Sequence, residues 1–124
     1  MIEEGMYVSP LDTLRQARAE LVARGRTIGK FLDPDSGCVC LLGAIRVVLA
    51  PEFAEDPDIW TLFVGNAEIA SVEEVLAGQL PASFVSADPD TSNFVKLHEF
   101  NDHLDTSDDD VLALFDRAIA ALGD

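Results

Sequence analysis

The residues best suited to covalent chemistry are a cysteine, two histidines and an asparagine. Cys40 precedes an apolar segment that predicts a helix, and a thiol at a helix N-terminus can act as a nucleophile when a histidine lies nearby. His98 and His103 are the two histidines of the chain, and Asn101 could orient either ring, which gives a Cys, His, Asn order known from hydrolases. One interpretation is a hydrolase or transferase that uses Cys40. The other is a small apolar cysteine in the core.

Cysteine and histidine are also the ligands that zinc prefers. Cys38 and Cys40 could hold zinc together with His98 and His103, since four residues separate the two histidines. However, a Cys-x-Cys pair is an unusual half of such a site, and residues five apart on a helix do not share a face. The sequence therefore does not favour zinc.

A second candidate metal site is a stretch of twelve residues that begins at Asp88. As a calcium loop it would offer oxygen ligands from Asp88, Asp90, Ser92 and Glu99. Lys96 places a cation at a ligand position of that loop, which weakens the interpretation. We expect no metal and no cofactor, and we expect the side chain of Asp90 or Ser92 to cap the helix that follows.

A cluster of carboxylates surrounds the predicted start of the last helix. We call it the acidic set, and its members are Asp102, Asp105, Asp108, Asp109 and Asp110. The helix macrodipole favours acids in a first turn, so a solvated helix start explains the cluster in part. The same carboxylates are the predicted binding residues for a protein partner with a basic surface.

The net charge of the chain limits the classes of function that are expected. The chain of 124 residues has 23 acidic and eight basic residues and a formal net charge of −15. Residues 31–124 hold 19 of the acids and only three of the bases. Such a surface repels phosphate backbones, so direct nucleic-acid binding is not expected. Three interpretations remain: a solubilising surface, a face that docks on a basic protein, or a mimic of the charge of DNA.

The sequence also indicates the cellular compartment of the protein. No signal peptide is evident at the N-terminus, and the longest apolar run, residues 38–49, is interrupted by Arg46 and is too short to span a bilayer. A disulfide between Cys38 and Cys40 would be strained, so reduced thiols are expected. We predict a cytoplasmic protein without a membrane partner.

Capping signals and hydrophobic periodicity predict three clear helices. Ser9-Pro10 predicts the start of a helix that Gly25 ends. Residues 41–50 predict a central helix that is apolar on nearly all sides, and Thr106-Ser107 precedes the start of the last helix. The buried faces of the first and last helices are predicted to carry Leu11, Leu14, Ala17, Leu21 and Val22, and Val111, Leu114, Phe115, Ala118, Ile119 and Leu122.

The segments between these helices have weaker signals. Residues 30–32 and 38–40 flank a turn rich in Asp, Pro and Gly, and predict a small β-hairpin before the central helix. The capping box Ser71–Glu74 predicts the start of a short helix. A further helix is expected over about residues 93–104, and residues 51–70 have no assignment.

Two stretches resemble an uncharacterised family of small proteins from actinobacteria and their phages. The first is Val39–Ile45, which contains a Cys-x-Leu-Gly-Ala pattern, and the second is Phe100-Asn101-Asp102 followed by the last helix. The resemblance covers about a third of the chain and implies that four residues form a linked set: Cys40, Gly43, Asn101 and Asp102. We expect Gly43 to let another helix approach closely, and the Asn101 and Asp102 side chains to cap backbone groups where the last two helices meet.

The predicted fold class is therefore mainly α, a compact bundle of about four or five helices with a small β-hairpin before the central helix, in a single domain over residues 1–124. The predicted function is a non-enzymatic protein-binding or regulatory module, encoded by a phage, that docks through its acidic surface. The alternatives are the hydrolase or transferase that uses Cys40 with His98 or His103, and a DNA-mimic inhibitor of a basic nucleic-acid-binding protein.

Overall fold

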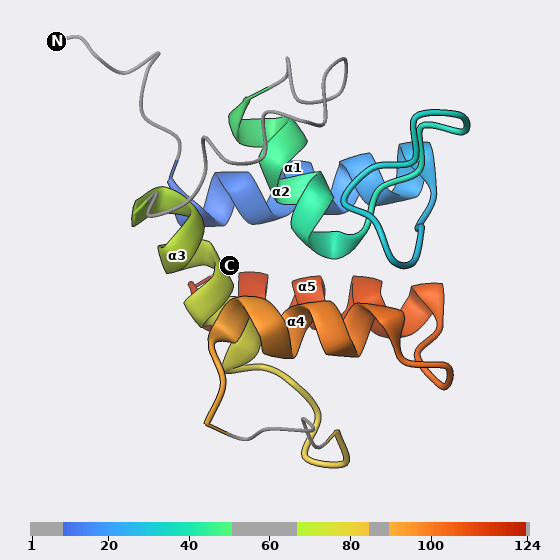
Figure 1. Ribbon diagram of the computed structural model, residues 1–124. Helices are drawn as coiled ribbons and strands as arrows, with labels where there is room; N and C mark the ends of the chain where they lie inside the picture. Colours follow the sequence, from blue (N-terminus) through green and yellow to red (C-terminus); the bar gives the residue numbers. More distant parts are fainter. Residues whose placement is uncertain (1–8, 51–66, 85–89, 124) are drawn as a thin grey trace, which may run out of the picture.

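Five α-helices make up the regular structure in the computed structural model, which describes residues 9–50, 67–84 and 90–123 (Figure 1). In chain order they are α1 (Pro10–Arg24), α2 (Leu41–Leu49), α3 (Ala67–Ala77), α4 (Asn93–Asp102) and α5 (Asp108–Ala121). The expected helical bundle is confirmed for these residues.

Serine side chains fix three of the helix starts through local hydrogen bonds. Ser9 accepts from the amide of Asp12 at 3.2 Å, and Ser92 accepts from the amide of Val95 at 3.3 Å. Ser107 accepts from the Asp110 amide while the Asp110 carboxylate accepts from the Ser107 amide, which completes a capping box. These bonds satisfy amide groups that have no partner within the helix, so the helices begin where the sequence predicts.

In Figure 1 α1 and α2 lie in the upper part of the molecule, α4 and α5 lie in the lower part, and α3 lies at one end. Helix α1 packs on α2 and on α5, α2 also packs on α4, and α3 contacts α1, α4 and α5. The largest side chains with no exposed surface come from every helix and belong to one core cluster: Leu14, Leu41, Leu42, Ile45, Leu76, Leu97, Leu114 and Phe115. None of the described helices is long and apolar enough to cross a bilayer.

The predicted hairpin is not found. Over the described residues the bridges are isolated ones, in which Val39 pairs with Arg26 in parallel and with Leu32 in antiparallel orientation. The turn does reverse the chain, because the Asp33 amide donates to the carbonyl of Cys38 at 2.8 Å. Helix α2 begins two residues after Val39, so the second arm is too short to form a ladder.

Three further expectations need correction. Ser71 lies inside α3, which begins at Ala67, so Ser71–Glu74 does not open that helix. Helix α4 ends at Asp102, so Leu104 belongs to the following turn. Val22 is 61% exposed, because α1 presents Leu14, Ala17 and Leu21 to the core and Val22 lies beside that face. The segment left without assignment is residues 51–70, and residues 51–66 of it lie outside the described residues.

Candidate functional site

Cys40 is the N-cap of α2, and its thiol is bound to the helix it precedes. The side chain has 1% of its surface exposed, and Sγ accepts a hydrogen bond from the Gly43 amide at 3.3 Å. Burial raises the pKa of the Cys40 thiol to about 11, against the effect of the amides that face it. The thiol is therefore protonated at neutral pH and acts as a capping group.

The two histidines have partners of their own. His98 Nε2 lies 3.3 Å from Asp102 Oδ2, one helical turn along α4. His103 Nδ1 accepts from the Asp105 amide at 3.1 Å, and its ring packs against Phe84. No hydrogen bond joins either histidine to Cys40 in the described part of the chain. This arrangement does not give the thiol a general base.

The residues of the candidate metal sites have other roles. Among residues 9–50, 67–84 and 90–123, no three His, Cys, Asp or Glu side chains gather in a way that could hold a metal ion. Asp88 of the candidate calcium loop lies outside the described residues. Ser92 caps α4, and Glu99 lies within that helix, so the second half of the twelve-residue stretch is helical and cannot wrap around an ion.

The structure joins the four residues that the family resemblance groups together. Asn101 is fully buried, and its Oδ1 accepts from the Leu41 amide at 3.2 Å, at the first residue of α2. Asn101 Nδ2 donates to the Thr27 carbonyl at 3.1 Å and to Asp102 Oδ1 at 2.9 Å. Asp102 in turn accepts from the Gly29 amide at 3.2 Å. The two side chains therefore anchor the loop after α1 to the start of α2.

This geometry corrects two details of the expectation. The side chains of Asn101 and Asp102 cap groups on the loop and on α2, and not at the junction of the last two helices. At Gly43 the close neighbour is the backbone of Phe31 and not another helix, since a Cβ there would lie 1.9 Å from the Phe31 carbonyl oxygen. Cys40 takes part as well, because its amide donates to the same carbonyl at 3.0 Å.

The turn between α4 and α5, residues 103–107, is held at both ends by Arg26. The Arg26 guanidinium donates to the carbonyl of Asn101 and, at 2.8 Å, to that of Thr106. Its Nε lies 2.7 Å from Asp108 Oδ1, at the first residue of α5. Only 10% of the Arg26 side chain is exposed, so its bonds to the two carbonyls are partly shielded from water, whereas the Asp108 side chain is 72% exposed.

Leu104 stands at the tip of this turn with 96% of its surface exposed. The side chains around it in sequence, His103 and Asp105, are exposed, as are Asp108, Asp109 and Asp110. The fifth member of the acidic set, Asp102, is half-buried and bound to Gly29. The turn therefore presents one apolar side chain among carboxylates.

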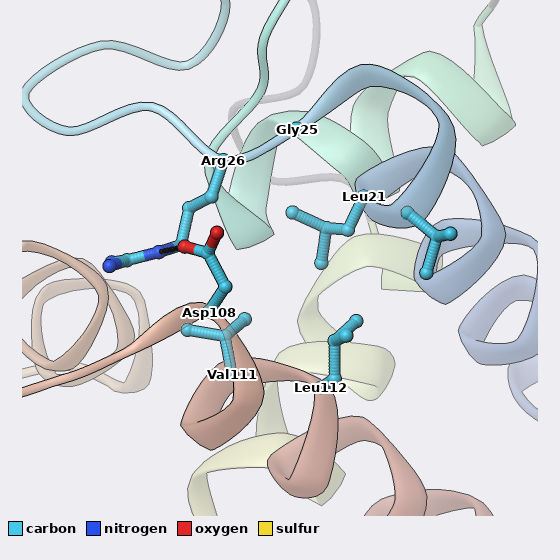
Figure 2. A pocket seen from close by; sticks show the side chains of 7 residues that line it. Leu21, Gly25, Arg26, Asp108, Val111 and Leu112 are labelled. Carbon is cyan, nitrogen blue, oxygen red and sulfur yellow. Dashed lines mark hydrogen bonds and ion pairs between the residues drawn. The ribbon is translucent and has the colours of Figure 1, made fainter.

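Two pockets flank the turn. The first, the apolar pocket, has a volume of about 240 Å³ and lies between α1 and α5. Figure 2 shows the side chains of Leu21, Val111 and Leu112 around it, with the ion pair of Arg26 and Asp108 at one end. Positions 108, 111 and 112 share one face of α5, as the spacing of a helix requires.

The second pocket, the aromatic-acidic pocket, has a volume of about 460 Å³. Its lining residues come from the segment after α3, from α4, from the turn and from the start of α5. They are Pro81, Ser83, Phe84, Phe100, His103, Asp105, Thr106 and Asp110. Asp110 lies two positions after Asp108, so it points to a different side of α5. The acidic set thus borders both pockets.

Comparison with protein families gives one match, a family of unknown function, DUF6197, over residues 6–121. The chain belongs to this family. No curated protein matches the chain, and no solved structure matches it. The DUF6197 match confirms that the chain belongs to a family without a known function, and it covers residues 6–121.

Sequence reasoning missed Arg26 and Leu104 as parts of the site. For Arg26 no local pattern could have found its role, because its partners lie 75 to 82 residues away in the chain. Leu104 had a usable signal, since it is a lone apolar residue between His103 and Asp105. We expected it to end α4, but the helix stops two residues earlier.

A buried ion pair was also missed. Arg46 and Glu73 have 5% and 9% of their side-chain surfaces exposed, and their closest charged atoms are 3.6 Å apart. The Arg46 guanidinium lies 4.8 Å from the centre of the Phe31 ring and 5.5 Å from that of Phe94. Burial raises the pKa of Glu73 and lowers that of Arg46. The pair joins α2 to α3 through two buried side chains, and Arg46 Nε and Glu73 Oε2 have no hydrogen-bond partner among the described residues.

Proposed function

We propose that this protein is a non-enzymatic protein-binding or regulatory module, which docks on a partner with a basic surface through the acidic set and the turn that carries it. The observation that supports this most is the exposure of Leu104 at the tip of a turn that Arg26 holds in place. An exposed apolar side chain surrounded by charges can act as the anchor of an interface, with a polar rim around it.

The turn is ordered before any partner arrives. Arg26 binds both of its ends, and inside it the Thr106 amide donates to the carbonyl of His103 at 3.0 Å. Binding then costs little further loop ordering, which is a cost that reduces the affinity of flexible surfaces. Carboxylates around Leu104 attract a basic partner over long range and speed its association.

The geometry gives less support to the two alternatives. Cys40 is buried, protonated at neutral pH and committed to capping α2, which favours a structural role over that of a nucleophile. A DNA mimic needs a row of free carboxylates. Here Asp102, Asp108 and Asp110 have partners within the chain, which supports a compact docking surface rather than an extended row.

The experiment measures capture of proteins from an actinobacterial lysate, because the two short stretches resemble proteins of actinobacteria and their phages. Asp105→Asn with Asp109→Asn removes two carboxylates of the acidic set, neither of which accepts a hydrogen bond within the described residues. Glu68→Gln with Glu74→Gln is the matched control, since it removes two exposed carboxylates from α3. Immobilised full-length chains are compared, and bound proteins are quantified by mass spectrometry.

We expect the wild type and the α3 control to capture the same basic proteins and to release them as salt is raised. The variant of the acidic set should lose them, and Leu104→Ser should weaken capture without changing the charge. Capture that ignores salt, or equal loss from both double variants, would contradict docking through the acidic set.

A further inference from the structure

We infer that the aromatic-acidic pocket receives the guanidinium group of an arginine side chain on the partner. The inference rests on the proposed function and names the chemical group that this surface recognises. Unlike the apolar pocket, whose carboxylate Asp108 is already paired with Arg26, this pocket has the carboxylates of Asp105 and Asp110, neither of which forms an ion pair with a described Lys or Arg.

One wall of the pocket is aromatic. The rings of Phe84 and Phe100 meet edge to face, with centroids 5.4 Å apart and planes at 87°. The ring of His103 meets Phe84 in the same way at 6.3 Å. The faces of such rings carry partial negative charge, and they attract a cation that lies within about 6 Å of a centroid. Arginine is the most frequent partner in such contacts because its planar group also stacks on the ring.

The negative charge of the pocket comes from the carboxylates of Asp105 and Asp110. The Asp110 carboxylate is held in place, because Oδ2 accepts from the Ser107 amide at 3.0 Å. The Asp105 carboxylate accepts no hydrogen bond in the part of the chain that the structure describes, so it is available to a ligand. The Asp105 backbone is fixed, since its amide donates to His103 Nδ1. A guanidinium between them gains hydrogen bonds to carboxylate as well as contact with the rings.

The pocket also has room for the side chain. Its volume of about 460 Å³ exceeds what one guanidinium needs, and neither Lys nor Arg is among the described residues that line it. An arginine that enters therefore meets no competing cation from the described lining residues. Leu104 lies between the lining residues His103 and Asp105 in the chain, so a partner whose arginine enters the pocket comes close to Leu104.

The experiment titrates the isotope-labelled full chain with N-acetyl-arginine amide and follows backbone amide signals by NMR. N-acetyl-citrulline amide is the control probe, since it has nearly the same shape and no charge. We expect arginine amide to bind in the millimolar range and to shift the signals of Phe84, His103, Asp105 and Thr106. We expect citrulline amide to leave them unchanged, and lysine amide to bind more weakly than arginine amide.

Two variants distinguish binding in the pocket from a general attraction of arginine amide to the acidic surface. Asp105→Asn and Asp109→Asn remove the same charge from neighbouring exposed positions, but only Asp105 lines the pocket. We expect Asp105→Asn to raise the dissociation constant of arginine amide by about threefold and Asp109→Asn to leave it nearly unchanged. Phe84→Leu keeps every charge and should also weaken binding by about threefold.

Equal effects of Asp105→Asn and Asp109→Asn would overturn the inference, because they would show a diffuse attraction to acids. Equal shifts with arginine and citrulline amides, or no shifts, would overturn it as well. In those cases the capture experiment still decides whether the acidic set docks on a protein. If arginine amide binds in the pocket while the acidic set proves dispensable for capture, the pocket stands and the proposed function fails.

Discussion

The side-chain oxygen of Asn101 accepts a hydrogen bond from the backbone amide of Leu41, a residue 60 positions earlier in the chain. This bond ties the end of α4 to the start of α2. It also joins the two stretches that carry the family resemblance, since the first supplies an amide at a helix start and the second supplies its cap.

Replacing Asn101 should therefore destabilise the whole fold. Asn101→Ala removes hydrogen bonds to the Leu41 amide and the Thr27 carbonyl and leaves the amide buried, at a cost of about 2–4 kcal/mol in the free energy of unfolding. Asn93→Ala, at the start of the same helix, is the control and should change that free energy by less than about 0.5 kcal/mol. Urea denaturation measures both, and similar values for the two variants would contradict the role of Asn101.

Gly43 should tolerate no side chain. A Cβ would lie 1.9 Å from the Phe31 carbonyl oxygen and 2.7 Å from its carbon, both of which are backbone atoms. Gly43→Ala must displace the loop or α2, and we expect it to cost about 3 kcal/mol, the upper end for overpacking. Gly78→Ala is the matched control, because its Cβ would have no neighbour closer than 3.5 Å and it should change stability by less than about 1 kcal/mol. Thermal unfolding of the two variants measures this difference, and equal melting temperatures would disprove the close approach of Gly43 to the Phe31 backbone.

The reactivity of Cys40 should be low in the folded chain. Burial raises its pKa to about 11, so little thiolate exists between pH 7 and 9, and the thiol is shielded. Native alkylation followed by mass spectrometry should modify the partly exposed Cys38 first and Cys40 only after denaturation. Rapid modification of Cys40 at neutral pH would instead support the hydrolase or transferase.

Glu73 should give stability a dependence on pH. Because burial raises the pKa of Glu73 above its ordinary value of 4.5, the folded state binds this proton more tightly than the unfolded chain. The stability that this group contributes is fully present below that value and is lost as pH rises through the raised pKa of the folded state. The Arg46 guanidinium, 3.6 Å away, reduces this loss without abolishing it.

The measurement compares wild type with Glu73→Gln by urea denaturation across a pH series. The wild type should lose stability relative to the variant as pH rises above 4.5. Glu74→Gln removes an exposed carboxylate one position along α3 and gives the baseline. A difference between wild type and Glu73→Gln that stays constant with pH would show that Glu73 does not titrate in this way.

The starts of α1, α4 and α5 were predictable from the sequence because the bonds that form them are local, whereas the predicted start of α3 at Ser71 was wrong. Ser9 and Ser107 each bind an amide three residues later, so the capping residue and its partner occur together in the sequence. The buried stripe of α5 was predictable from Val111 to Ile119, since its period follows from helix geometry, but Leu122 is 37% exposed because it lies at the C-cap. The predicted hairpin failed because Val39 bridges to two different segments, and pairing between segments depends on how they pack.

The sequence by itself determined the helical class, the capped starts of α1 and α5 and the acidity of residues 31–124. These depend on local bonds, periodicity and composition. Only the tertiary structure decided that Cys40 is a buried cap, that Arg26 holds the turn between α4 and α5, and that Leu104 and two pockets lie beside the acidic set. These features join residues that are distant in the chain, and packing alone brings such residues together.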